Sequence, residues 1–250
     1  MKSEISNIEP GRPARTGQLI LDRRYRIATR CRSERKIGAM LDIGCGNGAQ
    51  TRLFVPDADQ VVGFDLMPIQ DTEGYNKFDK FSFVQGNAEK LPFNDSVYNT
   101  ITSFEVLEHV PDDTAVLREM FRVLKPGGFL IISVPNRWWF FESHGANVPG
   151  FNWIPWNRIP FVSWLPTMIH DKIAQARIYT VPQTSRLVRD AGFRIRQSGF
   201  ITAPLDVLPN GSIQRFFRRT IFKEDTTGIP CLAVNLFITA EKPGKTHGTS

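Results

Sequence analysis

The stretch GAMLDIGCGNG at residues 38–48 decides the fold of this chain. Its apolar part, Met40 to Ile43, predicts a short buried strand, and three glycines follow within a few residues. Glycine lets the backbone turn sharply and approach a ligand closely. A short helix, predicted to run to about Phe54, would then present its N-terminus to that ligand. The stretch therefore predicts a strand, a ligand-binding turn and a helix in succession.

Outward from this stretch, apolar strands alternate with amphipathic helices. A KPGG turn at 125–128 is expected to end one helix and begin the next strand. Nearly continuous apolar strands are typical of a parallel sheet covered by helices on both faces. We therefore expect an α/β domain with a seven-stranded, mostly parallel sheet. The further strands are predicted at 60–65, 81–84, 97–104, 129–135, 193–200 and 231–240, and the helices at 17–36, 112–124 and 180–191.

The pattern divides the chain into a basic N-terminal tail and helix (1–36), a main domain (37–242) and a flexible tail (243–250). In the first helix, the arginines are expected on the face opposite the apolar one. Residues 136–178 break the alternation and hold all five tryptophans, at 138, 139, 153, 156 and 164, with Arg137 and Arg158 among them. Long insertions in compact domains are usually lids or binding loops. We expect a substrate lid after strand five; the alternative is that the aromatics only pack the insertion onto the core.

The charge of the chain, +6 overall, is concentrated at two places. Residues 1–36 hold ten Lys/Arg and four Asp/Glu, and residues 186–223 hold eight and two. Such basic segments suit anionic lipid or nucleic acid, or they are simply solvated helix faces. The three cysteines form no CxxC pair, and neither a signal peptide nor a membrane-spanning run is expected. A cytoplasmic protein, in peripheral contact with a membrane surface, is the expectation.

Two acids bear on which ligand the glycine turn suits. The turn satisfies a GxGxxA dinucleotide pattern at 44–49, so binding of NAD is one interpretation. Asp42, two residues before the first glycine, would repel a pyrophosphate but attract the ammonium group of S-adenosylmethionine (SAM). Asp65 ends the next strand, where a carboxylate accepts the ribose hydroxyls of either ligand. The segment GNAEKLPF at 86–93 follows the third strand, and its polar side chain and backbone amides can hydrogen-bond the edge of an adenine ring. These features favour SAM and leave NAD as the rival.

The segments LDIGCGNG, VVGFD, GNAEKLPF, FEVLEHVPDD and LKPGGFLIISVPN occur in an order and spacing that resemble the class I SAM-dependent methyltransferases. The resemblance is closest to the group that includes the ubiquinone and menaquinone biosynthesis methyltransferases. It is strong over residues 38–136 and weak over 180–200 and 231–240. It implies a Rossmann-like fold, SAM as the cofactor and methyl transfer as the reaction.

The resemblance also implies which side chains hold the cofactor. Two positions depart from the family pattern, since Asn87 and Asn99 stand where the family usually has Asp; an amide at 87 can still hydrogen-bond adenine. The implied cofactor residues are Asp42, Gly44, Cys45, Gly46 and Gly48 around the methionine part, Asp65 and Leu66 at the ribose, Asn87 and Ala88 at the adenine, and Phe104 and Glu105 at the floor of the pocket.

Two histidines, His109 and His144, follow strands four and five, where ligands bind in this architecture. They are the candidate catalytic bases. Glu105, Glu108 and His109 would share one face if helical, and with His144 they could bind a divalent metal, as in some ubiquinone O-methyltransferases and small-RNA 3′-terminal methyltransferases. The same LEHV pattern is frequent in methyltransferases that use no metal, so a structural or cofactor-lining role for His109 stands beside it.

The aromatic insertion suits a small, lipophilic or aromatic acceptor such as a quinone, an isoprenoid or a glycolipid precursor. RFFRRTIFK at 215–223 is a second candidate for contact with a membrane interface. An RNA methyltransferase is the alternative that the basic segments leave open, although the sequence contains no recognised RNA-binding module. An NAD-dependent oxidoreductase is the third interpretation. We expect a small-molecule or lipid-like partner rather than nucleic acid.

Overall fold

A computed structural model of the chain describes residues 17–32, 35–68, 79–141, 144–146, 148, 156, 159–205 and 211–244. Half of the predicted tail and helix at 1–36 (residues 1–16 and 33–34), residues 245–250 of the predicted tail at 243–250, and the insertion residues Trp153 and Arg158 lie outside the described residues. No helix among those described is both long enough and apolar enough to cross a membrane.

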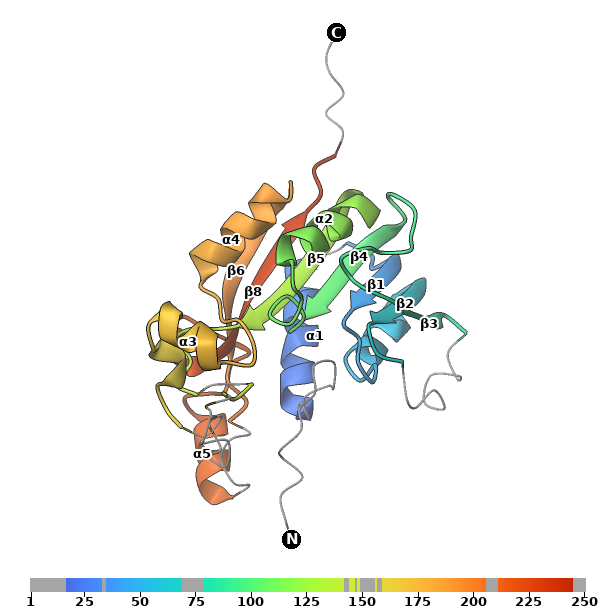
Figure 1. The fold of residues 1–250 in the computed structure, drawn as a ribbon. Coiled ribbons are helices and arrows are strands. Elements are labelled where there is room, and N and C mark those ends of the chain that lie inside the picture. Colours follow the sequence, from blue (N-terminus) through green and yellow to red (C-terminus); the bar gives the residue numbers. More distant parts are fainter. Residues whose placement is uncertain are drawn as a thin grey trace.

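The core of the fold is one eight-stranded sheet with the order β3-β2-β1-β4-β5-β8-β6-β7 (Figure 1). Strands β1 to β5 pair in parallel, and β8 runs antiparallel to both β5 and β6. The α/β prediction is confirmed, with one more strand than expected: the two-residue β7 pairs with the edge of β6. The strands are β1 (Ala39–Ile43), β2 (Gln60–Asp65), β3 (Phe81–Gln85), β4 (Tyr98–Phe104), β5 (Leu124–Pro135), β6 (Arg194–Thr202), β7 (Thr226–Thr227) and β8 (Ala233–Glu241).

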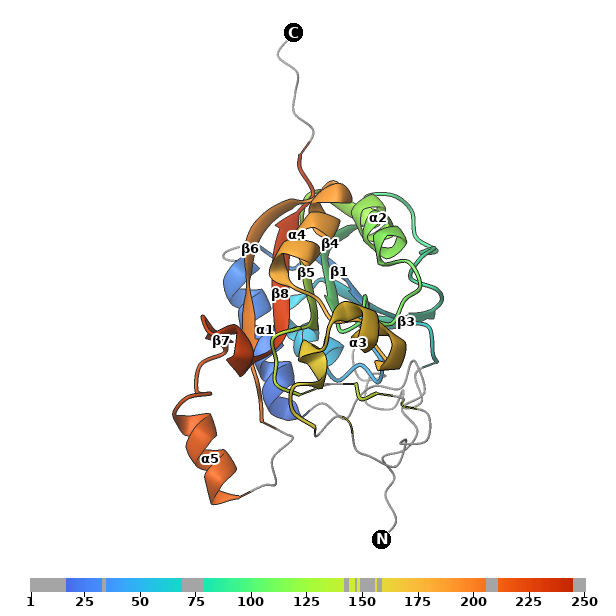
Figure 2. The same ribbon diagram turned by 60° about the vertical axis from the view of Figure 1, so that its left-hand side comes forward.

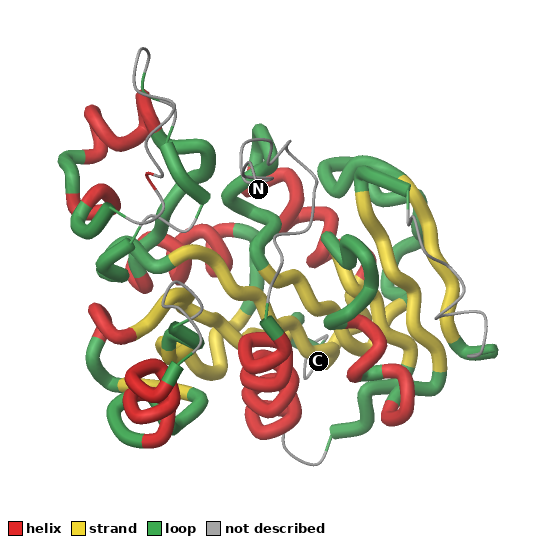
Figure 3. Tube along the Cα trace, turned by 90° about the horizontal axis from the view of Figure 1, so that it is seen from below, coloured by secondary structure: helices red, strands yellow, loops and turns green. Residues whose placement is uncertain are grey.

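Helices cover both faces of the sheet, because successive strand residues point to opposite sides. Leu41 packs with α2 and α4, and the preceding Met40 packs with α1 on the other face. Figure 2 shows α1 on one side of the sheet and α2 with α4 on the other, and Figure 3 shows the same layers from below. The α-helices are α1 (Gln18–Arg32), α2 (Asp113–Val123), α3 (Thr167–Ile173), α4 (Val181–Asp190) and α5 (Ser212–Arg219).

The prediction of a helix between the glycine turn and Phe54 is wrong. Two 3₁₀ turns, η1 (Thr51–Leu53) and η2 (Val55–Asp57), occupy this connection instead. Pro56 explains the break, because proline lacks an N–H and disfavours the helical conformation of the residue before it. The glycine turn is therefore followed by loop amides and not by an α-helix N-terminus.

The KPGG segment also differs from its prediction. It does not lie between α2 and the strand but inside β5, which begins at Leu124 directly after α2. Leu124 pairs with Tyr98 and Phe129 with Thr100, so the four residues between them bulge out of the ladder. Gly127, at a φ of 75°, supplies the left-handed backbone that this bulge requires.

The insertion after β5 packs partly onto the core and is partly exposed. Trp139 is buried with Ala203, Leu205 and Phe222. Trp138 and Trp164, in contrast, are 46% and 41% exposed. The alternative that the aromatics only pack the insertion onto the core therefore describes Trp139 but not its neighbour. The described parts of the insertion include η4 (Val162–Trp164) and α3, and η5 (Pro230–Leu232) lies next to β8.

The glycine turn gives a stability prediction with a matched control. Gly44 has a φ of 74°, and a Cβ there would lie 2.1 Å from Cγ2 of Val106. Gly127 has nearly the same φ, but a Cβ there meets nothing within 4 Å. We expect Gly127→Ala to cost roughly 1–2 kcal/mol through its backbone alone. Gly44→Ala should cost about 1–3 kcal/mol more, because it also overpacks the turn.

Urea unfolding of the two variants and the wild type measures this difference. Equal losses in both variants would contradict the close approach of Gly44 to Val106.

Candidate functional site

The glycine turn lies at the carboxyl ends of the parallel strands, where β1 and β2 end side by side. The amides of Gly44 and Cys45 both donate to the carbonyl oxygen of Phe64, at 2.7 and 3.2 Å. Gly44, Gly46 and Gly48 all have positive φ values, which glycine adopts without strain. The predicted turn is therefore confirmed as a loop tied to the end of β2.

Asp65 ties the same loop from the other side. Its Oδ2 accepts a hydrogen bond of 2.7 Å from the amide of Gly46, and its Oδ1 accepts one of 3.0 Å from the amide of Met67. Each carboxylate oxygen can accept more than one hydrogen bond, so this geometry leaves capacity for a ligand hydroxyl. Leu66, the other residue predicted at the ribose, exposes 61% of its surface beside it.

Asp42 lies beneath the turn and not on its surface. It is 2% exposed, and its two oxygens accept hydrogen bonds from the hydroxyls of Thr51 and Thr102, at 2.5 and 2.6 Å. Burial raises its pKa to about 6, although both hydrogen bonds oppose the rise. The structure therefore gives Asp42 a role in holding the turn onto β4, and its contact with a ligand ammonium stays a prediction. Cys45 is also buried, packed near Gly63.

The residues predicted to contact adenine form a compact turn after β3. The side-chain oxygen of Asn87 accepts from the amide of Glu89 at 2.9 Å, and Glu89 in turn accepts from the amide of Asp112. Ala88 packs partly against the main core. The amide at Asn99 has a different use, since its oxygen accepts from the amide of Ala39 and from Lys125.

Glu105 belongs to a buried ion pair that the sequence did not predict. Its Oε1 lies 2.8 Å from the Arg24 guanidinium of α1 and accepts a 2.7 Å hydrogen bond from Asn235 of β8. Burial would raise the pKa of Glu105, but Arg24, His144 and Asn235 together hold it at about 2. Arg24 also lies over the ring of Phe104. Arg24 therefore brings a positive charge to the end of β4.

The prediction that the arginines of the first helix lie on a solvated face is wrong at two positions. Arg23 and Arg24 are only 1% and 4% exposed. The prediction put all the arginines opposite the apolar face, although the 3.6-residue period places Arg24 between Ile20 and Ala28 on that face. The partners of Arg23 and Arg24 come from segments about 80 to 200 residues later in the chain, which a periodicity argument does not see.

The two candidate catalytic histidines lie side by side. The rings of His109 and His144 are 4.8 Å apart at their centroids and meet edge to face. Their Nε2 atoms lie 4.0 and 3.8 Å from Oε1 of Glu108, and the three side chains offer donor atoms within 4.8 Å of one another. Burial lowers the pKa of His109 to about 4. The structure thus brings together two residues that are far apart in the sequence.

The helical face that Glu105, Glu108 and His109 were expected to share is not present. Residues 105–110 form a turn and not a helix, so Glu105 and Glu108 do not share a helical face. Glu105 turns to Arg24, and Glu108 turns to the histidines. Glu108 is buried, its pKa is raised well above the usual value by that burial, and neither of its oxygens has a hydrogen-bond partner among the described residues.

A cavity of about 240 Å³ adjoins Glu108. It lies between the turn after β4 and the end of the insertion. Arg177 at the cavity donates to the carbonyl oxygens of Leu107 and Val110, and so fixes the turn that carries Glu108 and His109. Sequence analysis did not single out Arg177. The cavity is lined by Glu108, Val110, Pro111, Asp171, Ala174, Gln175, Ala176 and Arg177.

The chain is similar to known methyltransferases over its central part. Residues 41–132 match the family described as "Methyltransferase domain". A protein of Mycolicibacterium smegmatis named "Probable S-adenosylmethionine-dependent methyltransferase" is 32% identical over 124 residues, which is 50% of this chain and 46% of that protein. The ubiquinone biosynthesis O-methyltransferase of Aliivibrio fischeri is 33% identical over 103 residues, 39% of this chain and 44% of that enzyme. The aligned part thus spans less than half of each relative.

Solved structures agree on the fold. A SAM-dependent methyltransferase from Mesorhizobium loti superimposes with a TM-score of 0.58 at 16% identity, covering 87% of this chain and 95% of that one. At this identity the likeness shows the class I methyltransferase fold alone. It extends over the weakly matching C-terminal strands that the sequence comparison leaves out.

The buried Asp42 carboxyl predicts a pH dependence of stability. Its pKa is raised from 3.8 to about 6, so between these values the folded state binds more protons than the unfolded state. The free energy of unfolding therefore falls as the pH rises through this window. Asp42→Asn has no carboxyl to titrate at this position, so its stability does not fall in this window for that reason. The free energy of unfolding of the variant, relative to that of wild type, should therefore rise by up to about 3 kcal/mol between about pH 4 and pH 7.

Chemical denaturation at a series of pH values measures this trend. Asp59→Asn, at an exposed position nearby, should follow the wild-type profile. A stability difference between Asp42→Asn and wild type that does not change with pH would refute the raised pKa of the buried Asp42 carboxyl.

Proposed function

We propose that the chain is a class I SAM-dependent methyltransferase, which transfers the methyl group of SAM to a small lipophilic or aromatic acceptor; the methyltransferase-domain match and the similar relatives and fold support this. The observation that carries this proposal is the loop of Gly44 to Gly48, tied to the Asp65 carboxylate at the ends of β1 and β2. The family match favours SAM over NAD, the two ligands that the glycine pattern left open.

The residues around the loop fit the parts of SAM. The glycines leave the loop without side chains, so a ligand can approach the backbone closely. Asp65 faces the loop with acceptor capacity for ribose hydroxyls. Arg24 and Glu105, a buried pair of opposite charges, are proposed to face the carboxylate and ammonium groups of the methionine part. Asn87 and Ala88 are proposed to border the adenine.

Bound SAM would supply a methyl group already activated by the positive sulfur. The chain mainly has to hold the acceptor in line with it, and such alignment can account for about 7–11 kcal/mol of a barrier. We propose His109 and His144 as the groups that take the acceptor proton, at Nε2 of one ring. General-base catalysis of this kind contributes roughly 10²–10⁴-fold.

The size and lining of the cavity beside Glu108 favour an acceptor that carries a small polar head group. Its volume of about 240 Å³ suits a single ring, and its wall combines Glu108, Gln175 and Arg177 with apolar residues. The aromatic side chains of the insertion, several of them exposed, would cover the apolar remainder of such an acceptor. Peripheral contact with a membrane follows naturally if the acceptor is a lipid.

A divalent cation is the second candidate use of the same cluster. Glu108, His109 and His144 offer one carboxylate and two imidazoles within reach of each other, an oxygen and nitrogen donor set that suits Mg²⁺, Mn²⁺ or Zn²⁺. The carboxylate oxygens of Glu108, which lack hydrogen-bond partners among the described residues, fit this use. A cation held there would polarise an acceptor oxygen and lower its pKa.

Transfer of a tritiated methyl group from SAM tests the proposed function. The purified protein is incubated with lipid extract, RNA and small-molecule fractions of the source cell. We expect label in the lipid or aromatic small-molecule fraction, and a fall of about 10²-fold or more in His109→Asn. The chemically matched His247→Asn, outside the described residues, should keep the wild-type rate.

Two other outcomes would change the assignment. Label in RNA alone would favour the RNA methyltransferase, and no label in any fraction would contradict methyl transfer to these classes of acceptor. Dialysis against a chelator, followed by return of Mg²⁺, Mn²⁺ or Zn²⁺, separates the two uses of the cluster. Loss and recovery of activity would assign the metal, and unchanged activity would assign the base.

A further inference from the structure

Helix α5 and the residues after it carry large apolar side chains that are exposed to solvent. Ile213 and Phe216, three residues apart on one helix face, are 71% and 63% exposed, and Ile221 beyond the helix end is 56% exposed. Side chains of this size are normally buried in a folded domain. Their exposure together marks a contact surface, defined here as the α5 surface: Ile213, Arg215, Phe216, Arg219, Ile221 and Lys223.

The opposite face of α5 is firmly attached to the domain. Gln214 is 3% exposed and donates to the carbonyl oxygen of Leu205, and Arg218 donates to that of Pro204. Phe217 packs against the small core built on Trp139 and Phe222. The exposed face is thus presented by a helix fixed on its other side, so its side chains need no refolding to be presented.

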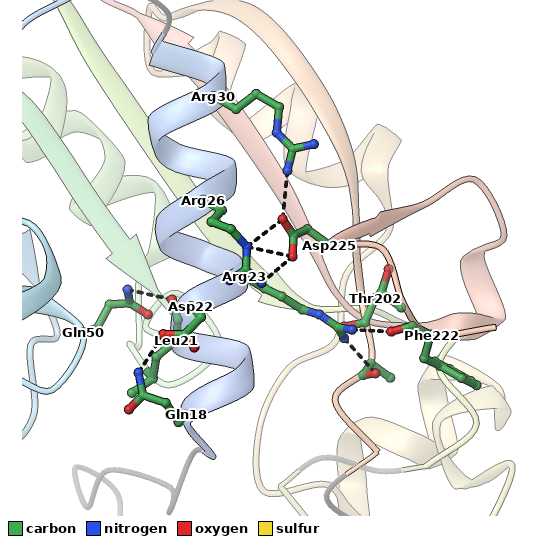
Figure 4. Close-up of polar contacts among 11 residues, drawn as sticks. Gln18, Leu21, Asp22, Arg23, Arg26, Arg30, Gln50, Thr202, Phe222 and Asp225 are labelled. Atoms are coloured by element: carbon green, nitrogen blue, oxygen red, sulfur yellow. Dashed lines mark hydrogen bonds and ion pairs between the residues drawn. The ribbon is translucent and has the colours of Figure 1, made fainter. Parts of the chain in front are cut away.

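Helix α1 is hydrogen-bonded to the segments on either side of α5. Arg23 donates to the carbonyl oxygens of Thr202, Ala203 and Phe222, on both sides of α5 in the sequence. Figure 4 shows this arginine reaching across from α1, with Arg26 and Arg30 both bound to Asp225. The next residue of α1, Arg24, pairs with Glu105, which directly follows β4 at the candidate site. One helix therefore joins the α5 surface to the site.

The positive charge of residues 211–223 indicates which kind of partner fits the α5 surface. Residues 211–223 contain four Lys/Arg and no acidic residue. A second copy of the chain at this face would bring like charges together, which disfavours a symmetric dimer. Two of the three exposed apolar side chains of this surface, Ile213 and Ile221, are aliphatic, and aliphatic side chains insert among acyl chains rather than stack on RNA bases. Apolar side chains beside arginines match the acyl and headgroup layers of an anionic membrane.

We propose that the α5 surface docks on an anionic membrane, with Ile213, Phe216 and Ile221 in the interface and the arginines at the headgroups. Figures 1 and 2 show α5 beyond the end of the sheet toward which β4 and β5 run, the end that carries the candidate site. Docking there would keep the site close to the lipid surface. This inference deepens the proposed membrane contact and rests on it.

Vesicle co-sedimentation of the full chain, without SAM or acceptor, tests the docking. The vesicles are phosphatidylcholine with or without phosphatidylglycerol. We expect binding only to the anionic vesicles, weakened by added salt. Ile213→Ser/Phe216→Ser should bind at least about tenfold more weakly. Val97→Ser, at an exposed valine before β4, should bind like wild type.

Charge reversal gives an independent arm. Arg215→Glu/Arg219→Glu should lose binding to anionic vesicles, and Arg118→Glu, an exposed arginine on α2, should lose far less. Circular dichroism confirms that each variant is folded. Methyl transfer to an acceptor dissolved in detergent should stay at the wild-type rate in the α5 variants, which separates a failure of docking from a failure of the proposed reaction.

Two results would overturn the inference: equal vesicle binding by wild type and both α5 variants, or no binding of the folded wild type to anionic vesicles. Salt-sensitive binding to RNA with no binding to vesicles would transfer the surface to a nucleic-acid partner.

Discussion

The hydrogen bond from the amide of Gly46 to the Asp65 carboxylate, 2.7 Å long, is the contact on which the candidate site depends. It joins the turn after β1 to the end of β2 and fixes the path of the glycine loop. Gly44 then passes so close to Val106 that only glycine fits there. The loop, the end of β2 and the turn after β4 are therefore held in one arrangement, which brings backbone amides and acidic side chains to the same edge of the sheet.

Charge is the second constraint at this edge. Asp42, Asp65, Glu105 and Glu108 all lie near the carboxyl ends of the central strands, and burying four carboxyl groups together is unfavourable. The structure meets this cost differently for each of them. Arg24 pairs with Glu105, two threonine hydroxyls bind Asp42, two backbone amides bind Asp65, and burial keeps the pKa of Glu108 high. Helix α1, which supplies Arg24, is thus part of the site and not an appendage.

The sequence was sufficient for the parts of this fold that local pattern determines. The strands around the glycine turn, helix α4 with its Thr180–Gln183 capping box, and the end of β2 at Asp65 were all predictable from spacing and turn chemistry. The helix after the turn was not, because Pro56 acts against a pattern that otherwise suits a helix. The two-residue strand β7 carries no periodic signal at all.

The candidate site divides in the same way. Its glycines and Asp65 follow from motif and position, whereas the roles of Arg24 and Arg177 depend on contacts between distant segments. Glu105 and Glu108 were expected to act together, but the backbone at Glu105, with a φ of 58°, turns the two side chains toward different partners. The pairing of His144 with His109 was suggested only by their shared place beyond the strand ends, and the structure places the two rings in contact.

The central claim is that the Asp65-anchored loop binds an adenosyl ligand, and calorimetric titration with S-adenosylhomocysteine tests it most directly. Wild-type protein should bind one equivalent. Asp65→Asn should bind roughly 10-fold or more weakly, because it loses charge-assisted hydrogen bonds worth about 1.5–3 kcal/mol each. Asp59→Asn, at an exposed site before β2, should bind like wild type. Absence of binding by the folded wild type, or equal affinity in Asp65→Asn, would contradict the account.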